Sequence, residues 1–360
     1  MGGGGLVQSV PVAIDNLQDL HVNQACGPRA GGKPWSLLKS ATVATTGDRS
    51  VSFAVNCPQL PTKEGAVSTN GTTRAHTDDR IRIERPADHV LRIVLARPEA
   101  HNAQDVRMLY ELNDAFDLGA QDDEVKVIIL AADGRNFSSG HDLNEDWPRG
   151  PLATEGGSGR SPVGCWGGFS QPGAEGWMAT EEEMFLGLCW RWRNLPKPTI
   201  AAVQGKVIGG GLMLIWPCDL IVAAADATFA DPVVAFGVNG HEYFTHVWEL
   251  GARKAKELLF TGRAMTADEA QRLGMVNQVV AREDVEEATL AMARDVARMP
   301  SLGLKLAKQS VNQSLDAQGQ WTAVQQAFSL HQVGHAHNRE LHGTWSDPDG
   351  AAVIRELGRT

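Results

Sequence analysis

Two glycine-containing segments of this sequence have the residue types needed to hold a developing negative charge. One is Phe137-Ser-Ser-Gly-His-Asp-Leu143, and the other, further along the chain, is Gly205-Lys-Val-Ile-Gly-Gly-Gly-Leu212. The small residues allow tight turns that present backbone N–H groups, and two such groups can stabilise a thioester oxygen as it becomes negative. An apolar helix follows the second segment, and its positive N-terminus would strengthen the field. The pair predicts an oxyanion hole.

The elements that must position these turns follow from hydrophobic patterning. Each turn comes after an apolar run that predicts a buried strand, at 124–131 and at 198–203. The remaining predicted elements are a β-hairpin over 81–95, a helix over 105–118, a helix from Gly210, a strand over 219–223, and helices over 252–260, 266–273 (with a capping box at Thr266), 283–299, 301–315 and 319–338. Repeated strand–turn–helix units with short connections predict an α/β fold.

Residues 1–78 differ in composition from the rest of the chain. They are rich in Gly, Ser, Thr, Val and Pro and show no sustained periodicity, which predicts a disordered extension. A small accessory domain, a targeting segment, or a start of the native protein near Val67 are the alternatives. We expect an ordered core over 79–265, a helical region over 266–340 and a tail over 341–360.

Composition restricts the class of protein. The chain has 360 residues, 42% of them hydrophobic and 21% charged, and a formal net charge of -10, which disfavours nucleic-acid and anionic-membrane partners. Five cysteines without metal-ligand spacing, and no secretory leader, predict reduced thiols and a cytoplasmic protein. No segment has the roughly 18 consecutive apolar residues of a membrane span.

The two turns and four further segments resemble the crotonase (enoyl-CoA hydratase/isomerase) superfamily over residues 80–340. The six segments, in the family's order, are 97–103 (Arg-Pro-Glu-Ala-His-Asn-Ala), 137–143, 197–211, 218–230, 261–270 and 273–277. The resemblance implies a spiral of ββα units with a C-terminal helical oligomerisation region, packed as a homotrimer or a dimer of trimers. It also implies an acyl-CoA substrate, no metal or redox cofactor, and stabilisation of a thioester enolate.

The resemblance also implies roles for individual residues. The backbone N–H groups of His141 and Gly210 would form the oxyanion hole. The positions that match substrate-binding residues of the family are Ala100, Ala103, Ser139, Gly140, Asp142, Leu143, Gly209 and Val233.

Both glutamates that hydratases of this family use for proton transfer are missing. Their positions hold Met213 and Val233, and neither side chain can carry a proton. Position 241 matches the place where dienoyl-CoA isomerases and a chlorobenzoyl-CoA dehalogenase carry a working aspartate. Here His241 and Glu242 stand together, so we predict that they supply acid–base catalysis, with Glu242 as the base or as the group that orients His241. The alternative is that His241 is a loop residue and Glu242 a helix cap.

Other polar residues have simpler interpretations. Asp142 is expected to accept backbone hydrogen bonds at a helix start, although Glu145 and Asp146 remain conceivable acids. His331 and His335, at i and i+4 of a helix, have a spacing that suits a metal. Because no third ligand is evident in the sequence, we expect a polar helix face there and no metal site.

Five tryptophans lie between residues 144 and 196, more than a simple linker would carry. Trp190 and Trp192 are expected to pack a helix against the core. For Trp147, Trp166 and Trp177 the sequence leaves open whether they pack the loop or line an acyl pocket.

Three functions fit this sequence. The first is an acyl-CoA enzyme of enoyl-CoA hydratase type. The second is an isomerase or C–C lyase that needs only one titrating group, and the third is a catalytically silent acyl-CoA-binding subunit, a class suggested by the residues at 213 and 233.

Overall fold

The computed structural model describes residues 40–43, 51–54, 80–145, 162–164 and 166–357. The chain divides into two compact units, Met1–Gly71 and Thr72–Thr360. In the first unit, β1 (Ser40–Val43) and β2 (Val51–Ala54) pair antiparallel. Both strands lie within residues 1–78, for which a disordered extension is expected, and the other residues of that segment up to 79 lie outside the described residues.

The second unit is built on a six-stranded sheet with the order β11-β8-β6-β5-β4-β3. All neighbouring strands are parallel except β3 and β4, which form the predicted hairpin. The strands are β3 (Ile81–Ala87), β4 (Val90–Leu95), β5 (Val127–Ala132), β6 (Thr199–Val203), β8 (Leu220–Ala224) and β11 (Gln278–Val280). Five of the six (all but β11) match strands expected from the apolar runs and the hairpin pattern, and the α/β prediction is confirmed.

A smaller sheet, with the order β10-β9-β7, adjoins the predicted turns. Its strands are β7 (Lys206–Ile208), β9 (Thr228–Ala230) and β10 (Met265–Thr266). Strand β7 runs directly into the second glycine turn, and an isolated bridge between Ser138 and Val207 joins it to the first turn. The small sheet therefore brings together two segments that are far apart in the sequence.

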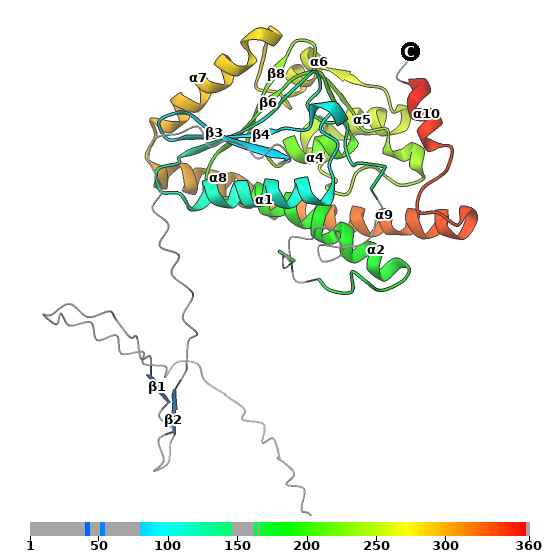
Figure 1. Cartoon of the computed structure of the whole chain (residues 1–360), viewed down its shortest axis with the longest axis horizontal. Helices are drawn as coiled ribbons and strands as arrows, with labels where there is room; N and C mark the ends of the chain where they lie inside the picture. Colours follow the sequence, from blue (N-terminus) through cyan, green and yellow to red (C-terminus); the bar gives the residue numbers. More distant parts are fainter. Residues whose placement is uncertain (1–39, 44–50, 55–79, 146–161, 165, 358–360) are drawn as a thin grey trace, which may run out of the picture. The chain divides into compact units, whose positions relative to one another are not determined.

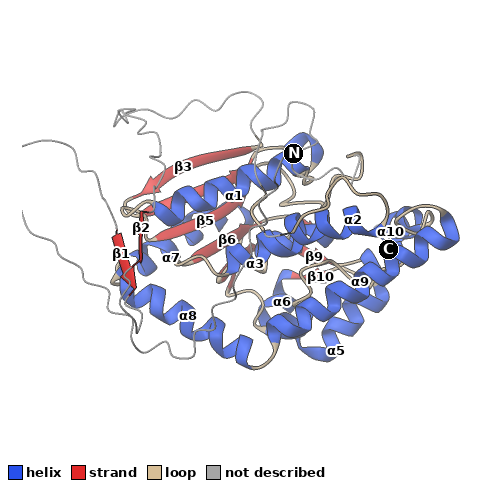
Figure 2. Ribbon diagram, turned by 90° about the horizontal axis from the view of Figure 1, so that it is seen from below, coloured by secondary structure: helices blue, strands red, loops and turns tan. Residues whose placement is uncertain are grey.

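Helices surround both sheets (Figures 1 and 2). The α-helices are α1 (Val106–Gln121), α2 (Ala174–Glu181), α3 (Leu188–Arg193), α4 (Leu212–Ile215), α5 (His246–Thr261), α6 (Ala267–Leu273), α7 (Val285–Ala297), α8 (Ser301–Ala317), α9 (Gln320–His342) and α10 (Gly350–Leu357). A π-helical turn, η3 (Glu182–Gly187), joins α2 to α3, and the short 3-10 turns are η2 (Pro98–Ala100), η4 (Gly209–Gly211), η5 (Val233–Phe236) and η6 (Arg282–Asp284).

The C-terminal helices lie where the sequence predicts them. Helix α6 begins as expected, because the Thr266 hydroxyl accepts a hydrogen bond from the N–H of Glu269 at 3.2 Å. The segment 341–360, expected to be a tail, contains α10, which packs against η5. The amphipathic pattern of α10 is short and follows a run of polar residues, so the sequence alone gave little sign of it.

The two faces of the large sheet are covered by different helices (Figure 1). On one face, Leu91, Ile93 and Leu95 of β4 belong to the cluster that includes the buried side of α1. On the other face, Val127 and Ile129 of β5 pack with the apolar side of α7. The alternation of side chains along each strand thus builds two apolar layers, one on each face of the sheet.

The tryptophans of the insertion are divided between core and surface. Trp192 is buried, with its ring 5.4 Å from that of Phe116, and Trp190 stacks on Trp321 at 4.0 Å. The prediction that these two pack a helix against the core is confirmed. Trp166 is exposed, and Trp147 lies outside the described residues.

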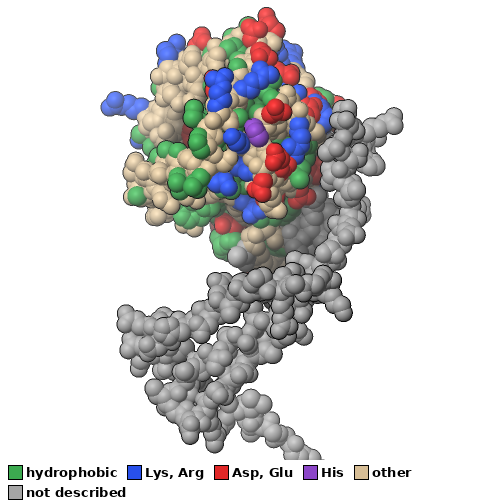
Figure 3. Space-filling view, turned by 90° about the vertical axis from the view of Figure 1, so that its left-hand side faces the viewer, with side chains coloured by type: hydrophobic (Ala, Val, Ile, Leu, Met, Phe, Trp, Pro, Cys, Tyr) green, Lys and Arg blue, Asp and Glu red, His purple; other side chains and the backbone are tan. Residues whose placement is uncertain are grey.

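On the face seen in Figure 3, basic and acidic side chains are interspersed rather than gathered into patches of one sign. Among the described helices, none has both the length and the apolar character needed to cross a membrane.

Candidate active site

The two glycine turns approach each other closely at Gly140 and Gly210. Gly140 has φ +90°, and a β-carbon there would lie 2.8 Å from the carbonyl oxygen of Ile208 and 3.1 Å from the nitrogen of Gly210. Any side chain at position 140 would therefore push the turns apart, and only glycine accommodates both the conformation and the contact. The N–H of Ile208 donates to the carbonyl oxygen of Ser138 at 3.1 Å and fixes the register of the two segments.

Gln104 ties both turns to the start of α1. Its side-chain amide donates to the carbonyl oxygen of Gly210 at 2.7 Å and to the Ser138 hydroxyl at 3.3 Å. Its own N–H donates to the carbonyl oxygen of Gly140 at 2.8 Å. The sequence reasoning missed this residue, although it directly follows the 97–103 segment.

Asp142 anchors the residues after the first turn. One carboxylate oxygen accepts from the Arg97 guanidinium at 2.6 Å, and the other accepts from the N–H of Asn144 at 3.0 Å. Burial opposes ionisation, but the hydrogen bonds from Asn144 and Arg97 prevail and lower the pKa of Asp142. As predicted, Asp142 satisfies a backbone donor, although at a turn rather than at a helix start.

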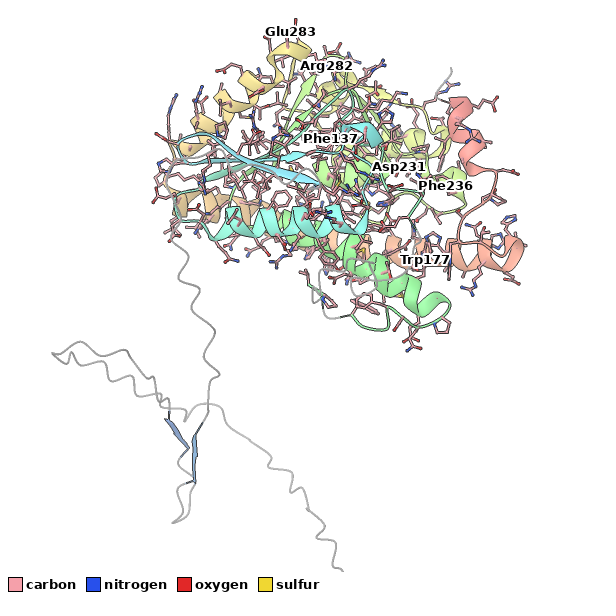
Figure 4. All side chains as sticks on the ribbon, in the orientation of Figure 1. Phe137, Trp177, Asp231, Phe236, Arg282 and Glu283 are labelled. Atoms are coloured by element: carbon pink, nitrogen blue, oxygen red, sulfur yellow. The ribbon has the colours of Figure 1, made fainter. Side chains whose placement is uncertain are left out.

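A cavity of about 420 Å³ opens beside the two turns. Most of its wall is apolar, and Trp177 and Phe236, labelled in Figure 4, form part of it. The predicted site residues that line the cavity are Ser139, Gly140, His141, Leu143, Gly209, Gly210, Val233 and Glu242. Those that do not line it are Ala100, Ala103, Asp142 and His241. Of the three tryptophans whose role the sequence left open, Trp177 lines this cavity.

Glu242 is the carboxylate that faces this cavity beside the glycine turns. Its side chain is buried, with one oxygen 3.4 Å from Nε2 of His141 and the other 3.6 Å from Nε2 of His331. Burial alone would raise the pKa of Glu242, but attraction to His141, a hydrogen bond with it, and attraction to His331 lower the pKa below its usual value. Glu242 is therefore an ionised carboxylate at neutral pH.

The ring of His141 covers the α-carbon of Gly210. A β-carbon at Gly210 would lie 2.7 Å from Cε1 of His141. The opposite contact of the imidazole is the ring of Phe185, stacked at a centroid distance of 3.9 Å. The side chain of His141 is thus held between the second turn and η3, with Nε2 directed to Glu242.

His241 does not reach the cavity. Its ring packs 5.0 Å from Trp216 and 4.5 Å from His246. Neither ring nitrogen has a hydrogen-bond partner, and burial, followed by the positive field of His246, lowers the pKa of His241 to about 3. We correct the expectation of a catalytic His241: its neutral ring belongs to the interior, because the side chains of adjacent loop residues 241 and 242 point in different directions.

Met213 and Val233, which the family resemblance matches to the glutamate positions of hydratases, carry no titratable group. Met213 is buried in the core, where its carbonyl oxygen accepts from the Cys189 thiol. Val233 lines the cavity. Asp231, two residues earlier, is buried and accepts from Nε2 of His246 at 2.7 Å, so it serves the interior rather than the cavity.

The cavity is lined by a second polar group, formed by Glu181, His331 and His335, and His331 brings this group next to Glu242. Nε2 of His335 lies 3.0 Å from one oxygen of Glu181, and Nε2 of His331 lies 3.9 Å from the other. Burial would lower the pKa of His335, but its contacts with Glu181 raise it overall. The sequence reasoning missed Glu181, which lies in the insertion with no motif around it.

Glu145, a conceivable acid from the sequence, is engaged at the start of α1. Its carboxylate accepts from the N–H of Val106 at 2.8 Å, and burial raises the pKa of Glu145 to about 7. Glu145 does not line the cavity described above, and Asp146 lies outside the described residues.

Most of the sequence matches a known family. The family model described as enoyl-CoA hydratase/isomerase matches residues 85–162 and 173–344, which include both turns and most of the residues that line the cavity. The chain belongs to this family. The crotonase-type resemblance noted in the sequence is thereby confirmed.

Relatives within the enoyl-CoA hydratase/isomerase family include proteins from mycobacteria. The chain is 44% identical over 255 residues to "Putative enoyl-CoA hydratase EchA13" of Mycobacterium tuberculosis, a match that spans 70% of this chain and 79% of that protein. The crystal structure of a "probable enoyl-CoA hydratase" from Mycobacterium smegmatis is 46% identical, with a TM-score of 0.66, and the match covers 74% of this chain and 98% of that one. The crystal structure of a "probable enoyl-CoA hydratase" from Mycobacterium thermoresistibile is 45% identical, with a TM-score of 0.64, and the match covers 73% of this chain and 99% of that one.

Proposed function

We propose that this protein is an acyl-CoA-processing enzyme of enoyl-CoA hydratase type that stabilises a thioester enolate between the two glycine turns. One observation carries the proposal: Gly140 and Gly210 meet at the edge of an apolar cavity that also contains an ionised carboxylate, Glu242. This combination supplies the two parts that enolate chemistry needs, a polar cradle for the oxygen and a base for the proton. No cofactor enters the proposed chemistry.

The oxyanion is assigned to the backbone N–H groups of His141 and Gly210. The apolar wall excludes water from the thioester, so hydrogen bonds to the developing charge gain strength. Gln104 supports this arrangement, because its bond to the Gly210 carbonyl restrains the second turn. Each backbone donor of this kind is worth about 3–4 kcal/mol of transition-state stabilisation.

Proton transfer is assigned to Glu242, with His141 as its positioning residue. The contact of 3.4 Å between Nε2 of His141 and the carboxylate places a hydrogen-bonding group beside the base. In a hydration, Glu242 would take a proton from the attacking water, and that proton would then be delivered to the α-carbon. A single carboxylate can perform both transfers in sequence.

A second reaction type is favoured by the apolar residues at 213 and 233. A double-bond isomerase or a C–C lyase also forms a thioester enolate but needs only one titrating group, which Glu242 supplies. A catalytically silent acyl-CoA-binding subunit is the third reading of the same substitutions, and it predicts binding without turnover.

The deciding experiment incubates the full chain with saturated and α,β-unsaturated acyl-CoAs in heavy water and follows each thioester by mass spectrometry. Addition of water identifies a hydratase, whereas isotope exchange or rearrangement without added water identifies the second reaction type. Gly210→Pro, which removes one donor, should lower turnover by about 10²–10³-fold. Glu242→Gln should lower it by about 10²–10⁴-fold.

Glu145→Gln is the matched control for Glu242→Gln, because it makes the same chemical change at a carboxylate away from the cavity. Turnover that survives Gly210→Pro and Glu242→Gln undiminished would exclude this site. Tight acyl-CoA binding without turnover of any thioester would leave only the silent subunit.

We further propose that α8 and α9 form a contact between copies of this chain. Large apolar side chains on these helices are more than half exposed: Leu302, Leu306, Val311, Leu330, Val333 and Leu341. Exposed apolar residues gathered on two neighbouring helices are typical of an oligomer interface. This supports the homotrimer, or dimer of trimers, that the family resemblance implies.

A further inference from the structure

The polar group formed by Glu181, His331 and His335 has the composition of a metal site. Glu181, His331 and His335 each offer one ligand atom, and the three atoms lie within 4.8 Å of one another. All three side chains are buried, and all three line the cavity. The sequence shows the two histidines one helical turn apart, and the fold adds the third ligand, Glu181 from α2.

Both imidazoles are oriented in the way that metal ligands require. Nδ1 of His331 donates to the carbonyl oxygen of Gly240 at 2.9 Å, and Nδ1 of His335 contacts the carbonyl oxygen of Trp345 at 2.5 Å. A backbone carbonyl at Nδ1 fixes the tautomer and directs the lone pair of Nε2 to the metal. The two Nε2 atoms accordingly face Glu181.

The surroundings of Nε2 of His331 indicate that a ligand is missing. The residue is 2% exposed, and this nitrogen has no hydrogen-bond partner. Its nearest carboxylate oxygens, on Glu242 and Glu181, lie at 3.6 and 3.9 Å. A buried nitrogen with an unused lone pair, aimed between two carboxylates, is costly unless something occupies the space.

The carboxylate of Glu181 is itself held in place. Nε1 of Trp177 donates to one oxygen at 2.7 Å, and Nε2 of Gln332 donates to the other at 2.5 Å. These bonds leave further lone pairs on both oxygens, and they restrain the carboxylate as surrounding groups do around bound metals.

We propose that Glu181, His331 and His335 bind one divalent transition-metal cation, such as Zn²⁺, in the wall of the acyl cavity. Two imidazoles and one carboxylate suit Zn²⁺, Co²⁺ or Fe²⁺ rather than Mg²⁺ or Ca²⁺, which prefer oxygen ligands. Three protein ligands leave at least one coordination position open to the cavity. The cation would there meet an oxygen atom of a polar acyl group or a water. This site departs from the expectation of no metal at these histidines.

A second group of three, Asp231, His241 and His246, is close enough for a metal but is less suited to one. One oxygen of Asp231 already accepts from Nε2 of His246 at 2.7 Å and from the N–H of His241 at 3.0 Å. None of the three lines the cavity. The observations therefore favour the group on α2 and α9.

The test uses the full chain, freed of any affinity tag and dialysed against a chelator, and then titrated with Zn²⁺ and with Co²⁺. We expect one cation per chain, and an intense visible Co²⁺ spectrum, because a site of low coordination number with imidazole ligands absorbs strongly. Glu181→Gln and His335→Ala should each weaken binding at least 100-fold. His337→Ala, which removes an exposed imidazole from the same helix, should leave the affinity unchanged.

Each variant is checked by circular dichroism and by its elution volume, so that loss of binding is read only from folded protein. Glu181→Gln preserves the shape of the side chain and is the variant least disturbing to the fold. Absence of stoichiometric binding by the unmodified chain overturns the proposal, and that measurement needs no variant. Equal affinity of the unmodified chain and folded Glu181→Gln overturns it as well.

Discussion

Replacement of Gly210 by alanine should destabilise this protein only while the ring of His141 is present. A β-carbon at Gly210 would lie 2.7 Å from Cε1, 2.9 Å from Nδ1 and 3.1 Å from Nε2 of His141. The backbone at Gly210 has no positive φ, so alanine itself is conformationally acceptable there. The cost of the substitution is therefore the displacement of one imidazole.

The magnitude follows from what holds that imidazole. It cannot move away from Gly210 without disturbing the stack on Phe185 at 3.9 Å and the contact with Glu242 at 3.4 Å. Forced repacking of a filled interior costs about 1–3 kcal/mol. Without the ring, the clash is gone, and Gly→Ala at an unstrained position is neutral or stabilises by about 0.4–1 kcal/mol.

Urea unfolding of four proteins measures this difference: the unmodified chain, Gly210→Ala, His141→Ala, and the double variant, all at one protein concentration. We expect a coupling free energy of about 1–3 kcal/mol, with the double variant more stable than the two single changes predict. Gly303→Ala, at a helical glycine with open space around it, is the control and should not destabilise. A coupling within about 0.5 kcal/mol of zero would refute the contact between the second turn and the His141 ring.

Three further predictions concern other parts of the chain. The pKa of His241 is lowered to about 3, so the stability linked to its neutral ring is fully present above its unfolded pKa of about 6.5 and is lost as the pH falls toward 3. Between pH 7.5 and pH 5 this loss in the free energy of unfolding is about 2 kcal/mol. Urea unfolding of His241→Phe should lack this part of the pH dependence. Lys308→Met should lower the free energy of unfolding by about 2–3 kcal/mol, because the buried ammonium donates to the Lys197 carbonyl and pairs with Asp219, whereas Lys305→Met should change it little. Leu306→Asp should reduce the mass of the protein in light scattering if α8 lies in an oligomer contact, and an unchanged mass would count against that interface.

The sequence predicted the frame of the site well, because the frame depends on local signals. Apolar runs placed β5 and β6, and the glycines after them marked turns that only glycine allows, as the contact of Gly140 with the Ile208 carbonyl demonstrates. Helical periodicity and the Thr266 cap placed the C-terminal helices within a few residues. These features are written into short stretches of chain, where residue type and backbone conformation are directly linked.

The polar groups of the cavity were harder to predict, because they are brought together from distant segments. His331 and His335 gave a spacing, but their partner Glu181 comes from α2, in an insertion with no recognisable pattern. The loop around position 241 predicted two catalytic side chains, and the structure directs only Glu242 to the cavity. Which of two adjacent loop residues points inward is decided by packing against other elements, and residue type does not reveal it.

The position of Glu242 is set by hydrogen bonds to the loop on which it lies. The carbonyl oxygen of Gly240 accepts from Nδ1 of His331 at 2.9 Å, and the N–H of His241 donates to Asp231 at 3.0 Å. The backbone on the N-terminal side of Glu242 is therefore anchored twice, to α9 and to the segment before η5. The proposed proton transfer requires Glu242 to be held in place by its surroundings, and these two hydrogen bonds support that proposal. Because the same His331 also offers Nε2 to the proposed metal site, binding of a cation at Glu181 would be felt at Glu242 through one side chain.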